Sequence, residues 1–431
     1  MSPSSSDYKP VTNDSLDVKE ATIDPVTVPD KLNVKKRSIH RNIFIMLIFL
    51  VLIGLLLIVI LQLKMGSKTS AKTNLSSKAS SGKSLTQVAT TPSSVKPPLT
   101  GLLDMEDQTP YQNDQPFPTT NLSQLNGYAG DFDGIVVNES WSQLEPQNGV
   151  YNWTPLNQSL NAVAAWNKQH ASNLLGVKLR IFAGQSAPIW VLQASSTVAI
   201  DVHGVSKEIG RWWTPPFMSA WHNFQQALAQ EYDSNPLVRA VSVSSCSSST
   251  GEPFVVSGAI ISQRNLQAAG WTIEAQDNCL SNALNDYSGW KQTQITFAFN
   301  PLYSASSSQV SFMDKMMQMC AKSQSDGGPD CVLGNNDLSP NPLTSSSGPA
   351  YSEISQIVKS NPNTSVYFQT AGPNYGNLTQ DCQALQQATS YNATSVELWP
   401  GNSPNLGFHL IPSSTLASWN HSLATHSQIT C

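Results

Sequence analysis

The sequence lacks the metal-binding and nucleotide-binding motifs of many enzymes. Its 431 residues include six cysteines, yet there is no Cys-x-x-Cys pair and no Cys/His cluster with the spacing of zinc ligands. The glycine pattern of dinucleotide-binding folds, Gly-x-Gly-x-x-Gly, is also missing. His203 and His222 have no partners at the spacing of a metal site or a catalytic triad. No metal and no organic cofactor is therefore predicted.

Charge is scarce and unevenly distributed. Charged residues make up 12% of the chain, and the part from Gly101 onward has 11 Lys or Arg against 23 Asp or Glu. The preceding segment, Gly66–Thr100, contains five lysines and no acidic residue. An acidic C-terminal part excludes nucleic acid as a predicted partner.

Cysteine is absent from the first hundred residues. All six cysteines follow residue 245, which is typical of an extracytoplasmic domain with three disulfides. Fifteen pairings are possible in principle. We favour Cys320 with Cys331, which are close in sequence, and Cys382 with Cys431, which ties down the chain end.

One long segment contains no charge. Residues Ile43–Leu61 read IFIMLIFLVLIGLLLIVIL and are long enough to cross about 30 Å of hydrocarbon. A cleaved signal peptide is the alternative, but about forty residues precede the segment and no small-x-small site follows. We predict a retained single-pass anchor in a lipid bilayer at residues 43–64.

The composition divides the chain into four parts. Residues 1–42 are polar and aperiodic and are predicted to form a disordered cytoplasmic tail. Residues 65–100 are rich in Ser, Thr and Lys and are predicted to form a flexible stalk. Residues 101–431 have a globular composition. We therefore expect a cell-membrane protein whose C-terminal domain is extracytoplasmic.

The globular part alternates apolar runs with helical patterns, which is typical of β/α repeats. Strands are predicted at residues 101–103, 134–138, 177–182, 240–244, 294–300, 331–333, 365–369 and 395–399. Helices are predicted at residues 155–170, 216–232, 308–322, 351–360, 379–390 and 413–425. Eight strands favour an α/β fold of the TIM-barrel type, (β/α)8, with a doubly wound sheet as the alternative.

Three stretches resemble clan A glycoside hydrolases, notably family 42 β-galactosidases. Residues 136–153, VVNESWSQLEPQNGVYNW, resemble the family's W-x-x-L-E-P-x-x-G-x-Y-x-W run. Residues 179–191, LRIFAGQSAPIWV, and 232–238, YDSNPLV, resemble its strand with a P-x-W-L loop and its link to the acid/base strand. The resemblance implies a (β/α)8 fold and cleavage of O-glycosidic bonds. In the family the acid/base strand ends in Asn-Glu, whereas here the sequence is Gly251-Glu252.

Glycosidases need two carboxyl groups, and elimination leaves few candidates. Of the nine Glu residues after Gly101, Glu139, Glu252 and Glu397 stand at predicted strand ends. The resemblance implies Glu252 as acid/base, with its pKa raised by burial or by the other carboxylate, and Glu397 as nucleophile. Glu397 falls on the eighth predicted strand, whereas the clan places its nucleophile on the seventh. Asp337 is the reserve partner if Glu397 fails.

Further residues are predicted to bind substrate. They lie in or beside loops at predicted strand ends, where indole faces pack on sugars and polar groups bind hydroxyls. The predicted substrate-binding residues are Glu139, Trp141, Arg180, Trp190, Asn300, Asp337, Gln369 and Trp399. The structural alternatives are core packing for each tryptophan and a buried ion pair for Arg180.

The sequence thus predicts a membrane-anchored, extracytoplasmic glycoside hydrolase of the retaining type, acting on an oligosaccharide or polysaccharide. The first alternative is a non-catalytic carbohydrate-binding or adhesion protein on the same barrel. The second is a structural wall protein. Two carboxyl groups about 5–5.5 Å apart would indicate a retaining enzyme and about 6.5–9.5 Å an inverting one, whereas a much wider separation would favour binding and a wall protein would lack a cleft. Carboxyl groups on opposite sides of the barrel, or sealed away from any opening, would contradict the enzyme.

Overall fold

The computed structural model describes residues 95–106, 116–202, 205–253, 260–300, 307–325, 331–344, 347–372, 375, 377–400 and 407–431. The predicted cytoplasmic tail, the apolar segment Ile43–Leu61 and the stalk up to residue 94 lie outside these residues. Within the described ranges, no helix combines the length and the apolar sequence that crossing a bilayer requires.

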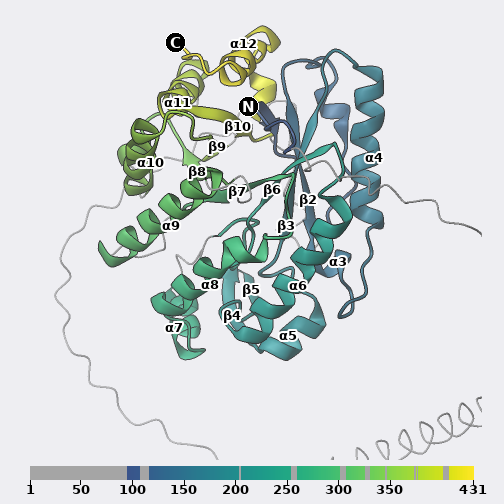
Figure 1. Ribbon diagram of the computed structural model, residues 1–431, viewed down its shortest axis with the longest axis vertical. Helices are drawn as coiled ribbons and strands as arrows, with labels where there is room; N and C mark the ends of the chain where they lie inside the picture. The colour runs from purple at the N-terminus through teal and green to yellow at the C-terminus, as the bar shows by residue number, and fades with distance from the viewer. Residues whose placement is uncertain are drawn as a thin grey trace, which may run out of the picture. The chain divides into compact units, whose positions relative to one another are not determined.

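Eight parallel strands close into a barrel, in the order β1-β10-β9-β8-β7-β6-β3-β2 (Figure 1). They are β1 (Gly101–Asp104), β2 (Gly134–Ser140), β3 (Gly176–Phe182), β6 (Val238–Ser242), β7 (Gln294–Ala298), β8 (Cys331–Leu338), β9 (Val366–Thr370) and β10 (Ala393–Leu398). The first strand pairs with the last, with Leu103 opposite Glu397. The predicted (β/α)8 barrel is confirmed, and this closure excludes the doubly wound sheet.

Helices surround the strands (Figure 1). The six predicted helices are present as α4 (Thr154–Gln169), α6 (Pro215–Tyr232), α9 (Ser307–Ser325), α10 (Gly348–Ser360), α11 (Leu378–Ser390) and α12 (Ser413–Ala424). Both α4 and α6 have proline in the first turn, where a missing N–H costs no hydrogen bond.

Several further elements were not predicted. They are α3 (Trp141–Leu144), α5 (Ile189–Ser195), α7 (Ile260–Ala268), α8 (Ile273–Asp286) and the turns η1 (Leu122–Leu125), η2 (Pro342–Thr344) and η3 (Gly407–Leu410). A further hairpin, β4 (Thr197–Val202) with β5 (Val205–Gly210), lies between β3 and α6 and forms its own two-stranded sheet. It lengthens one side of the barrel without joining it.

Strand β3 has two buried faces of opposite character. Val177, Leu179 and Ile181 belong to the apolar core between barrel and helices. Because side chains alternate along a strand, Lys178 and Arg180 point the other way, into the barrel. All seven residues of the strand are buried. The sequence VKLRIF therefore places two cations inside the barrel.

The N-terminal end of the barrel is closed by the segment before β1. Leu99 is buried against Gly134 and Gly176, where an added Cβ would approach its Cδ1 atom to 2.9 and 2.7 Å. The Lys96 ammonium donates hydrogen bonds to the carbonyls of Asn235 and Val238. These contacts join the segment before β1 to the barrel.

Three disulfides hold the domain together: Cys246–Cys279, Cys320–Cys331 and Cys382–Cys431. The two predicted pairs are confirmed. Cys320–Cys331 joins α9 to β8, and Cys382–Cys431 fastens the chain end to α11. Cys246–Cys279 joins the loop after β6 to α8, which matters for the site described next.

Candidate active site

Four charged side chains meet inside the barrel. The Lys178 ammonium lies 3.1 Å from Glu252 Oε1 and also forms a hydrogen-bonded ion pair with Glu397 Oε1. The Arg180 guanidinium lies 3.4 Å from the same Glu252 oxygen and pairs with Glu397 Oε2. All four side chains are 1–2% exposed. Two cations and two carboxylates thus form a closed and formally neutral cluster.

Neutral donors complete the surroundings of Glu252. Its Oε1 accepts hydrogen bonds from Tyr367 Oη at 2.9 Å and Ser242 Oγ at 3.2 Å, and its Oε2 accepts one from Asn336 Nδ2 at 2.5 Å. The Lys178 ammonium lies 3.8 Å from the centroid of the Tyr367 ring. The Glu252 carboxylate is therefore bound by five side chains from four strands.

Glu252 reaches the cluster on a loop that enters the barrel mouth. We call residues Cys246–Pro253 the plug. Ser247 and Ser248 of the plug are fully buried. The backbone N–H of Gln185 donates a hydrogen bond to the Ser248 carbonyl at 3.0 Å. At Gly184 an added Cβ would lie 2.0 Å from that carbonyl oxygen, so only glycine lets the plug approach.

The plug is also held from outside. The disulfide Cys246–Cys279 and a 2.8 Å hydrogen bond from Gln276 Nε2 to the Cys246 carbonyl fix its start to α8. Within the plug, Ser247 Oγ donates to the Thr250 carbonyl at 2.6 Å. Near its end, Gly251 packs on the Arg180 side chain, where a Cβ would come within 2.7 Å of Cδ. These contacts seal both carboxylates from solvent.

The protonation of Glu252 differs from the prediction. Burial alone would raise the pKa of Glu252, but the positive charges of Arg180 and Lys178 and the hydrogen bond from Asn336 outweigh burial and lower the pKa to about 2. The predicted upward shift is wrong for this closed arrangement, because the two cations could not be placed beside Glu252 from the sequence. In the closed state Glu252 is ionised and cannot donate a proton.

Glu397 lies on β10, the eighth strand of the barrel. Its backbone pairs with Leu103 on one side and Gln369 on the other. The seventh strand, β9, carries Gln369 and Thr370 at its carboxyl end. The chain thus keeps no carboxylate at the strand end where clan A is expected to have its nucleophile.

Two predicted tryptophans belong to the core and not to a cleft. Trp141 is fully buried, with its ring centroid 5.0 Å from that of Trp221 and 5.5 Å from that of Phe217. Trp190 packs edge-on against Trp141 and donates to the Glu145 carbonyl at 3.2 Å. The structure does not bring either indole to Glu252 or Glu397.

Of three other predicted residues, Asn300 and Gln369 lie beside the site, whereas the charge of Asp337 acts on Tyr351 and Tyr375. The Asn300 side chain accepts a hydrogen bond from the backbone N–H of Asn336 at 3.1 Å and donates one to the Pro253 carbonyl at 3.5 Å. It therefore links the plug to Asn336, which binds Glu252. Gln369 is buried beside Glu397. Asp337 follows Asn336 on β8, and its side chain is half-buried.

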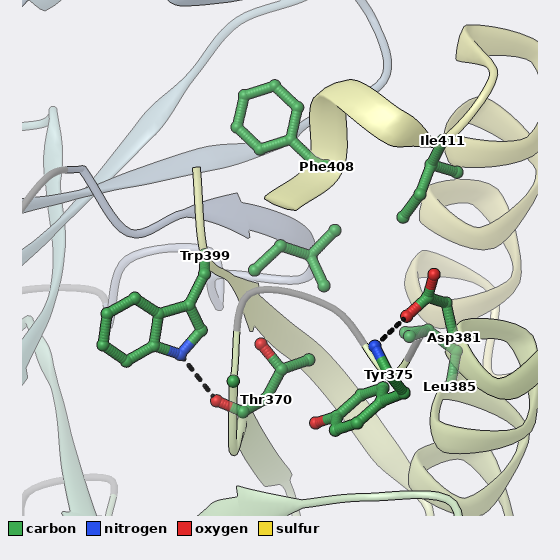
Figure 2. Close-up of a pocket in the computed structure, with 9 residues that line it drawn as sticks. Thr370, Tyr375, Asp381, Leu385, Trp399, Phe408 and Ile411 are labelled. Carbon is green, nitrogen blue, oxygen red and sulfur yellow. Dashed lines mark hydrogen bonds between the residues drawn. The ribbon is translucent and has the colours of Figure 1, made fainter. Parts of the chain in front are cut away.

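Trp399 stands at the end of β10, beside the barrel mouth. Its indole N–H donates to the Thr370 carbonyl at 2.7 Å (Figure 2). With Thr370, Tyr375 and Phe408 it lines a cavity of about 10 Å³, which is room for about one water molecule. Of the predicted aromatic residues, Trp399 is therefore the one placed next to the carboxylate-bearing strand.

Glu139 lies elsewhere than predicted. It is fully buried, and neither carboxylate oxygen has a hydrogen-bond partner among the described residues. It shares the helix-facing side of β2 with Ile135 and Val137, because alternate residues of the strand face the core outside the barrel. It is thus separated from the Glu252–Glu397 pair by the barrel wall.

Burial raises the pKa of Glu139 from 4.5 to about 8, and burial followed by the charge of Asp104 raises that of Glu106 to about 8. Each carboxyl ionises near its ordinary pKa in the unfolded chain but stays protonated in the folded one. The folded state therefore binds more protons between about pH 4.5 and pH 8, and stability falls as pH rises through this window.

The free energy of unfolding should fall less between pH 5 and pH 8 in Glu139→Gln than in the unsubstituted chain. We expect a difference of at least about 1.4 kcal/mol, the equivalent of one pKa unit. Urea unfolding at four pH values across the window measures it. The matched control is Glu208→Gln, on an exposed position of β5, which should leave the slope unchanged. Equal slopes in Glu139→Gln and the unsubstituted chain would show that Glu139 is not the buried acid described here.

Sequence reasoning missed four of the five side chains that bind Glu252: Lys178, Ser242, Asn336 and Tyr367. One signal was present, because two cations at alternate positions of an apolar strand must share a face. The partners of Lys178, however, lie 74 and 219 residues away in the chain. Among the described residues, no three His, Cys, Asp or Glu side chains converge on a position that could hold a metal ion.

None of the known protein-family models matches the chain, and no curated protein matches it. Solved structures do align. Endoglycoceramidase II from Rhodococcus sp., in a ganglioside GM3 complex, is 12% identical over 77% of this chain and 81% of its own, with a TM-score of 0.48. A Pseudomonas stutzeri endoglucanase is 10% identical over 78% of this chain and 98% of its own, with a TM-score of 0.44.

A triple mutant of an endo-β-1,4-glucanase from Xanthomonas axonopodis pv. citri is 11% identical over 75% of this chain and 99% of its own, with a TM-score of 0.41. Identities near a tenth and TM-scores below 0.5 support no conclusion about activity. The barrel assignment rests on the strand order, and the narrower resemblance to family 42 stays a prediction.

Proposed function

We propose that this chain is a glycoside hydrolase whose reaction takes place inside the mouth of the barrel. The observation that carries the proposal is the meeting of Glu252 and Glu397. They lie 145 residues apart in the sequence, yet both contact the Lys178 ammonium and the Arg180 guanidinium. Two carboxyl groups brought together in the chain's fold are what hydrolysis of a glycosidic bond requires.

The roles follow from how each carboxylate is held. Glu397 is fixed on a strand and oriented by Lys178 and Arg180, which suits a nucleophile that attacks the anomeric carbon. Glu252 stands on the plug and not on a strand, so the proposal requires the plug to withdraw from the barrel mouth. It would protonate the leaving oxygen and later take a proton from water, as the acid/base of a retaining enzyme does.

The closed arrangement described above is a resting state under this proposal. The plug fills the mouth, and Glu252 is ionised. A sugar can reach Glu397 only when the plug withdraws, and withdrawal also separates Glu252 from Arg180 and Lys178. Without those charges the pKa of Glu252 rises from about 2 towards the ordinary range of a carboxyl group, and a bound sugar that excludes water from the mouth would raise it further towards working pH.

We also propose that the hydrolase is held at the cell surface. Residues 43–64 would span the bilayer, residues 1–42 would form a cytoplasmic tail, and the stalk would hold the barrel on the extracytoplasmic side. Three disulfides support an oxidising compartment for the barrel. The substrate would be an oligosaccharide or polysaccharide.

The proposal is tested with the full chain purified in detergent and a panel of aryl glycosides. We expect release of the aryl alcohol, and proton NMR of the first product formed should show the same anomer as the substrate. An inverted first product would contradict the retaining mechanism. No release from any glycoside of the panel would contradict the hydrolase itself.

A second function is favoured by one observation. The seventh strand ends in Gln369 and Thr370 and has no carboxylate. Among the described residues, the two carboxylates that contact Lys178 and Arg180 are neutralised by these two cations. This arrangement fits a barrel that binds glycan without cleaving it. Saturable glycan binding by the full chain, with no product after long incubation, would establish this second function.

A further inference from the structure

We propose that Lys178 and Arg180 form a receptor for one carboxylate of the substrate, which makes the substrate an acidic glycan containing a uronic acid. In the resting state Glu252 of the plug occupies this receptor in place of the sugar carboxylate. The inference rests on the proposed function for its catalytic consequence, but the receptor can be tested by binding alone.

The donors around Glu252 form a complete carboxylate site. Glu252 Oε1 forms ion pairs with Lys178 and Arg180 and accepts hydrogen bonds from Tyr367 and Ser242. Glu252 Oε2 accepts a hydrogen bond from Asn336. The other donors are neutral and Glu397 balances one of the two cations, so the vacated site has a net charge of +1 and selects a single negative charge. A guanidinium and an ammonium beside hydroxyl and amide donors are the groups that recognise carboxylates in proteins.

The receptor has two polar atoms that form no hydrogen bond with Glu252 or Glu397. Arg180 is 1% exposed, yet its Nε atom has no hydrogen-bond acceptor among the described residues. Asn336 Oδ1 is likewise buried without a partner and could accept a hydroxyl of the same sugar. Both atoms belong to side chains that already contact a carboxylate of the cluster.

The occupant and the receptor belong to different parts of the fold. Lys178 and Arg180 stand on β3, in the barrel wall, whereas Glu252 arrives on the plug. Removing Glu252 leaves two cations and one carboxylate in a buried place. A buried unpaired charge is costly, so the vacated receptor should take up an anion from solution.

The exchange would couple recognition to catalysis. A sugar carboxylate that binds Lys178 and Arg180 displaces Glu252 and relieves it of the charges that keep it ionised. A neutral sugar offers no such replacement and leaves the cluster closed. Uronic acid substrates would thereby release the proton donor that their own cleavage needs.

The test compares methyl β-D-glucuronide with methyl β-D-glucoside, which differ only in the carboxylate at C6. Calorimetric titration into the full-length double variant Glu252→Ala with Gly184→Ala, in which the receptor is vacated and the plug is displaced from the mouth, should show affinity for the glucuronide at least about tenfold higher, as one additional ion pair in a buried site provides. Adding Lys178→Met leaves one cation and one carboxylate and should abolish the preference. Equal affinity of the double variant for both sugars, or binding of neither, would overturn the receptor.

Two measurements do not depend on the fold of Glu252→Ala. In Gly184→Ala the added methyl group would lie 2.0 Å from the Ser248 carbonyl oxygen, so the plug is displaced while Glu252 stays in the chain. This variant should show the same preference for the glucuronide. In the unsubstituted chain, the glucuronide should raise the unfolding temperature more than the glucoside does at equal ionic strength, and equal temperatures would contradict the receptor.

Failure of the receptor and failure of the hydrolase give different results. Selective binding of the glucuronide without cleavage of any aryl glycoside would keep the receptor and remove the hydrolase. Cleavage of neutral aryl glycosides, with no preference for glucuronides in binding or turnover, would keep the hydrolase and remove the receptor.

Discussion

Replacing Lys178 by methionine is expected to lower the free energy of unfolding by about 3–5 kcal/mol, which is typical of breaking a buried ion pair. Methionine fills most of the space of the lysine stem, so the loss reports the charge. Without Lys178, the two carboxylates share Arg180 alone and one negative charge stays uncompensated in a place that is 1–2% exposed. Chemical unfolding of the full chain in detergent, followed by tryptophan fluorescence, measures the loss.

The control and the compensating variant make this prediction specific. Lys168→Met changes an exposed lysine of α4 and should alter the free energy by no more than about 0.5 kcal/mol. The double variant Lys178→Met with Glu252→Gln restores one cation and one carboxylate, so its loss should be smaller than the sum of the single losses. A loss below about 1 kcal/mol for Lys178→Met would mean that the cluster is hydrated and not sealed.

Replacing either carboxylate of the pair by an amide is expected to lower kcat/KM by at least about 100-fold, the lower end of what acid–base catalysis contributes. Glutamine keeps the shape of Glu252 and Glu397 but can neither attack carbon nor donate a carboxyl proton. Initial rates with an aryl glycoside that the full chain hydrolyses measure the effect, and Glu208→Gln on β5 serves as the matched control.

The leaving group separates the two roles. A dinitrophenolate departs without protonation, so Glu252→Gln should lose much less activity on a dinitrophenyl glycoside than on a phenyl glycoside. Glu397→Gln should lose activity on both alike, because attack on carbon is needed in either case. Unimpaired turnover in one variant would remove that residue from the mechanism.

The barrel was predictable because its strands are short, apolar and bounded by turn residues. Each predicted strand overlaps an observed one, and even the weakest, residues 101–103, is present as β1. The hairpin β4–β5 was missed because half of its residues are exposed or polar and its pairing is local. α7 and α8 were also missed, although their share of apolar residues is no lower than that of the predicted helix α11.

The meeting of Glu252 and Glu397 was predictable from the rule that catalytic groups gather at the carboxyl ends of barrel strands. Which face a side chain takes was not. Glu139 and Asn138 are neighbours in β2, yet Asn138 bonds the Met105 carbonyl whereas Glu139 lies in the outer core, and one residue of register decides between them.

The state of ionisation was beyond the sequence for a related reason. The pKa of Glu252 depends on Lys178 and Arg180, which precede it by more than seventy residues and become its neighbours only when β3 and the plug are both in place. Burial and charge act in opposite directions on this carboxyl, so the sign of its shift follows from distances and not from residue types.

The most direct measurement is to trap the glycosyl-enzyme intermediate. A 2-deoxy-2-fluoro glycosyl fluoride of a sugar that the full chain hydrolyses slows the second step, so the attached sugar can be located by mass spectrometry of the peptides. We expect a single adduct on Glu397, lost in Glu397→Gln and retained in Glu208→Gln. An adduct on another residue, or turnover of the aryl glycoside without any adduct, would contradict Glu397 as the nucleophile of a retaining hydrolase.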